Sequence, residues 1–81
     1  MSLQTEKILL ESKINGLKRD VESKKMEGEM FVQQVRNELS PYLEFDELDT
    51  EKAQVAFNNI TRLSTEIKDL KKDIQKLEKR L

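Results

Sequence analysis

The 81-residue sequence predicts an all-α protein that folds as an antiparallel two-helix coiled-coil hairpin. The last third of the chain carries a heptad repeat of apolar residues, and the only proline stands at the midpoint of the sequence. Charged residues make up 38% of the chain and hydrophobic residues 36%, with two glycines and one proline. This composition is typical of long helices, so we expect a single helical domain over residues 1–81.

We predict the first helix over residues 3–39. Its seam is interrupted, because four of its positions hold Lys7, Lys24, Gly28 and Glu38. Because a glycine costs only about 1 kcal/mol within a helix and no proline precedes Pro41, we expect one continuous helix. Its apolar seam residues are Leu3, Leu10, Ile14, Leu17, Val21, Phe31 and Val35.

A turn is predicted over residues 40–49. Pro41 moves Ser40 out of helical geometry and thereby ends the first helix. The turn also contains four large apolar residues, namely Tyr42, Leu43, Phe45 and Leu48. We favour an arrangement in which they pack over the tip of the hairpin. Alternatively, they form an exposed surface that binds another protein, with the neighbouring acidic residues as its polar rim.

The second helix is predicted over residues 50–81. Asp49 or Thr50 can cap its first turn by accepting backbone N–H groups. Its apolar residues alternate in spacings of four and three, which is the heptad repeat of a left-handed coiled coil. These seam residues are Ala56, Ile60, Leu63, Ile67, Leu70, Ile74, Leu77 and Leu81.

Two registers can pair the helices. In the register that we predict, the numbers of facing residues add up to about 84, so that Leu3 meets Leu81 and Gly28 meets Ala56. Both helix ends then coincide. A shift by one heptad gives sums near 91, which places Gly28 against Leu63 and leaves Leu3 beyond the end of the second helix.

The hairpin is expected to associate further, because several apolar residues have no place in a single narrow seam. These residues are Ile8, Leu9, Met26, Met30, Val32, Val55 and Phe57. We predict a dimeric four-helix bundle made from two copies of the chain. The alternative is a parallel coiled-coil dimer, since Ile at a and Leu at d in the second helix favour two parallel strands.

The composition disfavours enzymatic chemistry. The chain has no cysteine and no histidine, which removes thiolate catalysis and the commonest metal ligand and general base. The acidic run over residues 44–51 lacks the ligand spacing of a calcium loop. We therefore expect no catalytic, cofactor-binding or metal site. The net charge of −1 and the absence of a long apolar stretch also disfavour nucleic-acid and membrane binding.

We therefore expect a non-enzymatic, cytoplasmic structural or protein–protein interaction module that self-associates through its coiled-coil seam. Its turn is a candidate surface for another protein. The alternative is an accessory helix pair that binds nucleic acid through clusters of basic residues on the helix flanks. The clusters are Lys18, Arg19, Lys24 and Lys25 in the first helix, and Lys68, Lys71, Lys72, Lys76, Lys79 and Arg80 in the second.

Overall fold

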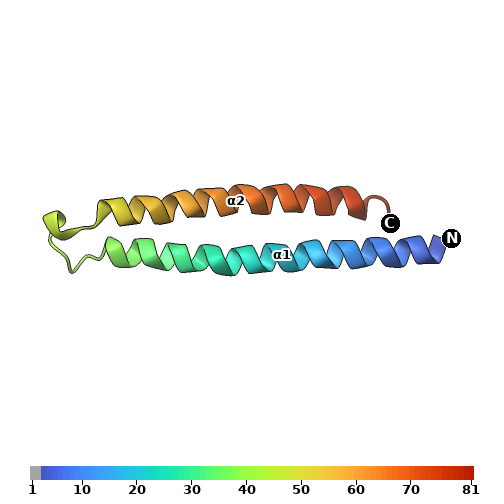
Figure 1. The fold of residues 1–81 in the computed structure, drawn as a ribbon, viewed down its shortest axis with the longest axis horizontal. Coiled ribbons are helices and arrows are strands. Elements are labelled where there is room, and N and C mark those ends of the chain that lie inside the picture. The colour runs from blue at the N-terminus through green and yellow to red at the C-terminus, as the bar shows by residue number, and fades with distance from the viewer. Residues whose placement is uncertain (1–2) are drawn as a thin grey trace.

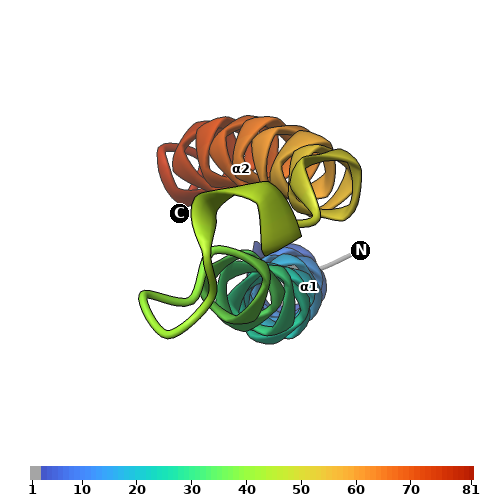
Figure 2. The ribbon, with the colours of Figure 1, turned by 90° about the vertical axis from the view of Figure 1, so that its left-hand side faces the viewer.

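The computed structural model describes residues 3–81, which form an antiparallel helical hairpin (Figure 1). Helix α1 spans Leu3–Glu38, the short 3-10 helix η1 spans Phe45–Glu47, and helix α2 spans Thr50–Glu78. The molecule is a rod with extents of 65 × 14 × 14 Å. Seen along the rod, α1 and α2 cross at a small angle and the turn closes one end (Figure 2). The predicted all-α hairpin is confirmed, and the helices are antiparallel within one chain.

The helix ends follow local hydrogen bonding. Helix α1 ends one residue before the predicted position, and the Leu39 amide donates to the Val35 carbonyl at 3.0 Å. The carboxylate of Asp49 accepts the Lys52 backbone N–H at 3.0 Å, so Asp49 is the N-cap of α2. Helix α2 ends at Glu78, three residues before the predicted end.

The core is a single row of apolar side chains between the two helices. Leu17, Ile67, Leu70 and Leu77 are partly buried and pack against a buried cluster of Ile14, Val21 and Ile74. Among the remaining predicted seam residues, Leu10, Phe31, Val35 and Ile60 are half-buried, whereas Leu81 is 54% exposed. The buried hydrophobic residues are Ile14, Val21, Ala53, Ala56, Leu63 and Ile74.

The register of the two helices differs from the predicted one. A Cβ atom built on Gly28 would lie 3.9 Å from Cδ1 of Leu63, and the numbers of these residues add up to 91. The Lys24 ammonium lies 3.0 Å from the Glu66 carboxylate, a pair whose numbers add up to 90. The prediction of sums near 84 is therefore wrong by one heptad.

Side-chain size explains the observed register. Leu63 is the largest fully buried side chain, and it occupies the space that Gly28 leaves open. The predicted register would have placed Gly28 against Ala56, and two such small residues would leave a void in a seam that favours close packing. The predicted contact of Leu3 with Leu81 involves a Leu3 side chain outside the described part of the structure.

Gly28→Ala is expected to stabilise the hairpin by up to about 1 kcal/mol, because alanine has the higher helix propensity. Its Cβ would be in ordinary van der Waals contact with Leu63 at 3.9 Å. Thermal unfolding followed by circular dichroism measures the change. Gly16→Ala is the matched control, since a Cβ atom at this position would meet nothing within 4 Å. This variant should show only the stability gained from the higher helix propensity of alanine. A loss of stability in Gly28→Ala alone would contradict the described packing.

Candidate interaction surface

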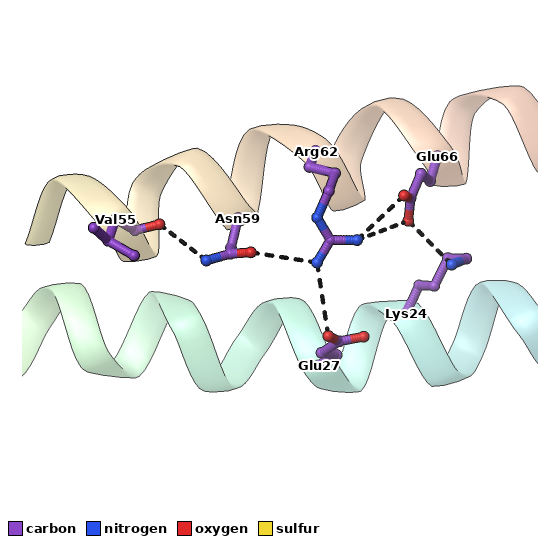
Figure 3. Close-up of polar contacts among 6 residues, drawn as sticks. All are labelled: Lys24, Glu27, Val55, Asn59, Arg62 and Glu66. Carbon is purple, nitrogen blue, oxygen red and sulfur yellow. Dashed lines mark hydrogen bonds and ion pairs between the residues drawn. The ribbon is translucent and has the colours of Figure 1, made fainter. Parts of the chain in front are cut away.

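One flank of the hairpin, which we call the ion-paired flank, is bridged by polar side chains (Figure 3). The Lys24 ammonium donates to Glu66 at 3.0 Å, which joins α1 to α2. The Arg62 guanidinium lies 3.2 Å from the same Glu66 carboxylate and 3.8 Å from Glu27 on α1. Arg62 also donates to the side-chain oxygen of Asn59 at 3.3 Å. These contacts link α1 to α2 across the seam on this flank.

Glu66 is the shared acceptor of this network. The hydrogen bond from Lys24 lowers the pKa of Glu66, and the weaker effect of desolvation opposes it. The hydrogen bond from Arg62 and the attraction of both cations lower the pKa further. The folded hairpin therefore holds Glu66 in its charged form more strongly than the unfolded chain does.

We expect the contribution of Glu66 to stability to be present above the ordinary pKa of a glutamate. It should disappear as the pH falls through the lower pKa that Glu66 has in the hairpin. Thermal unfolding across this acidic range should show a shallower pH dependence in Glu66→Gln than in the parent chain. Lys24→Gln, which removes the main cause of the shift, should also flatten the profile. Identical profiles for the parent chain and Glu66→Gln would contradict this expectation.

The other side of the seam, which we call the groove flank, is an open groove. Lys25 and Ser64 line this groove, whereas Glu27 and Glu66 belong to the ion-paired network. Lys25 and Ser64 each precede one of these network residues by two positions. Side chains two positions apart on a helix point about 200° apart, so the groove lies on the flank opposite the ion pairs. Apolar residues that line it are Val21, Val32, Ile60, Leu63, Ile67 and Ile74, and the lysines that line it are Lys18, Lys24, Lys25, Lys68 and Lys71.

The fold thus brings together basic residues from the two clusters that the sequence analysis singled out. The groove is nevertheless of mixed charge, because Glu22, Glu29 and Glu78 also line it. Lys25 is paired with Glu22 at 3.4 Å. A polyanion would therefore meet carboxylates as well as lysines along this surface.

The sequence analysis did not identify the groove itself. A signal was present in the heptad pattern: Lys18, Ser64 and Lys71 each directly follow a predicted seam residue and therefore share one flank. In the antiparallel hairpin these positions from α1 and α2 border the same groove.

The turn presents two aromatic rings to solvent. Tyr42 is 96% exposed and Phe45 is 89% exposed, whereas Leu43 is 39% exposed and Leu48 is half-buried. The prediction that the aromatic residues of the turn pack over the tip is therefore wrong for Tyr42 and Phe45. The turn closes through short-range hydrogen bonds, such as that from the Glu47 amide to the Glu44 carbonyl at 2.9 Å. Closure therefore does not require these rings to be buried.

Neither family models nor curated proteins nor solved structures gave a match to this chain. Within residues 3–81, no group of three or more His, Cys, Asp or Glu side chains could hold a metal ion. No helix of this described range has the length and apolar character needed to cross a membrane.

Proposed function

We propose that the chain is a structural or protein–protein interaction module without enzymatic activity, and that it acts by coiled-coil self-association of the hairpin. The observation that carries this proposal is the apolar surface that the hairpin leaves uncovered. Among the described residues, six hydrophobic residues are buried, while eleven large ones are at least 39% exposed. Because a chain of this size has a small core, covering more apolar surface would add substantially to its stability.

The exposed apolar residues lie along the rod as well as at its tip. Met26 and Met30 are 68% and 74% exposed on α1, and Val55 and Phe57 are 61% and 55% exposed on α2. Surfaces of this kind are typical of protein contacts. A second hairpin laid along the rod would cover part of this surface, and the exposed turn is the part available to another protein. We place the chain in the cytoplasm, since without cysteine it does not depend on an oxidising compartment.

A second candidate function is nucleic-acid binding, which the five lysines that line the groove favour. Contacts to phosphates through these lysines would weaken steeply as the salt concentration rises. We rank this function below self-association, because glutamates line the same groove and the net charge of the chain is −1.

Sedimentation equilibrium over a wide range of protein concentrations tests the proposal. We expect the mass of a dimer or higher oligomer, and a shift toward the monomer in Phe57→Ser with the helix content retained. Thr61→Ser, an exposed change on the same helix, should leave the mass unchanged. A monomer at every concentration would refute self-association. Salt-sensitive binding of a single-stranded oligonucleotide by that monomer would favour the second function.

A further inference from the structure

We propose that two copies of the hairpin pair in opposite directions, groove flank to groove flank. The turn half of each copy, residues 27–63, then lies along the terminal half of the other, residues 3–26 and 64–81. This inference rests on the proposed self-association and adds the orientation of the copies and the surface between them.

The observed register divides the charges unequally between the two halves. The turn half carries eight acidic and three basic residues, a net charge of −5. The terminal half carries twelve basic and eight acidic residues, a net charge of +4. Residues 38–51 contribute six carboxylates and no basic residue. A chain that is nearly neutral overall therefore forms a rod with one acidic and one basic half.

This asymmetry favours one orientation. Two copies that point the same way would place acidic half beside acidic half and basic half beside basic half. Two copies that point in opposite directions place each acidic half beside a basic half, and the symmetry makes this contact twice. Charge complementarity of this kind sets the orientation and suppresses the wrong arrangement, even where single exposed ion pairs contribute little.

The groove flank is the surface that suits this pairing. The ion-paired flank already uses Lys24, Arg62 and Glu66 for contacts within the chain. On the groove flank of the terminal half, the buried residues Val21 and Ile74 form an apolar floor between lysines. Phe57 directly follows the buried Ala56 and so lies on the groove flank of the turn half.

In the opposed arrangement, Phe57 of one copy covers the apolar groove around Val21 and Ile74 of the other copy. The acidic turn half, whose Glu29 lines the groove flank, then faces Lys18 and Lys71 at the rim of that groove. One set of contacts thus covers exposed apolar surface and pairs opposite charges. The same contacts recur at the other end of the dimer.

Engineered cysteines test the orientation, because the natural chain has none. Spin labels on Asp46→Cys, at the turn, should be separated by most of the 65 Å length of the rod. Ser64→Cys, which lines the groove near the middle of the rod, should form a disulfide between copies on mild oxidation. Thr65→Cys is the matched control: it is exposed and about 100° further around the helix, and it should remain reduced.

Charge reversal tests the surface. Lys71→Glu, at the groove rim, should raise the Kd of the dimer about tenfold. The contact of Lys71 with the acidic half of the other copy occurs twice in the symmetric dimer, so one substitution removes it twice. Lys72→Glu changes the same type of residue beside it and should have a clearly smaller effect.

The solution mass is measured on the same samples. A monomeric mass would overturn the proposed function together with this inference. A dimeric mass with closely spaced Asp46→Cys labels would leave self-association standing and refute the opposed orientation. Equal weakening by Lys71→Glu and Lys72→Glu, or equal crosslinking of Ser64→Cys and Thr65→Cys, would refute the groove flank as the interface.

Discussion

Leu63→Ala is expected to destabilise the hairpin by about 2–5 kcal/mol, the usual cost of truncating a buried leucine. Leu63 is 1% exposed, and Gly28 across the seam has no side chain that could move into the resulting cavity. Small domains are stable by only about 5–15 kcal/mol, so this one change removes a large part of the total. Urea unfolding followed by helix content gives the value.

Leu9→Ala is the matched control for this measurement. It makes the same substitution in a helix at a position that is 56% exposed, where we expect a change within about 0.5 kcal/mol. Comparable losses at Leu9 and Leu63 would show that Leu63 does not lie at the centre of the seam.

Ala56→Leu is expected to destabilise the hairpin by about 1–3 kcal/mol through overpacking. Ala56 is 1% exposed, and the observed register places it across the seam from Val35. The sign of the effect distinguishes the two registers. In the predicted register, where facing residue numbers add up to about 84, Gly28 would lie opposite Ala56. A leucine at position 56 would then fill a gap and add stability.

The same unfolding measurement on Val55→Leu provides the control for Ala56→Leu. Val55 precedes Ala56 on α2 and is 61% exposed, so it can accept a larger side chain without displacing neighbours. A gain of stability in Ala56→Leu, with Val55→Leu unchanged, would contradict the observed register.

Local signals in the sequence were sufficient for the helices and the turn. The spacing from Ala56 to Leu81 predicted the face of α2 that contacts α1, except that Leu81 lies beyond the end of α2 and is 54% exposed. Pro41 predicted the end of α1, which lies at Glu38. Asp49 was one of two predicted caps, and its carboxylate accepts the Lys52 amide. Each of these features depends on residues within a few positions of one another.

The candidate interaction surface was predictable only in part. The sequence analysis named the basic clusters and the apolar residues of the turn, but it did not place Lys18 and Lys71 on one groove. It also favoured burial of Tyr42 and Phe45, which the structure leaves exposed. The heptad positions of Lys18 and Lys71 contained the signal for their shared flank. Burial of a turn side chain instead depends on which distant residues become its neighbours, and no local pattern contains that information.

The sequence by itself determined the two helices, the capped turn between them and the apolar faces that meet. Only the tertiary structure decided the register. When one helix is shifted by seven residues along the other, apolar seam positions still face apolar seam positions, so the heptad pattern fits both registers. The choice came from the fit of Leu63 over Gly28, a matter of side-chain volume across the seam. That register in turn placed Lys24 beside Glu66 on one flank, while the other flank is an open groove.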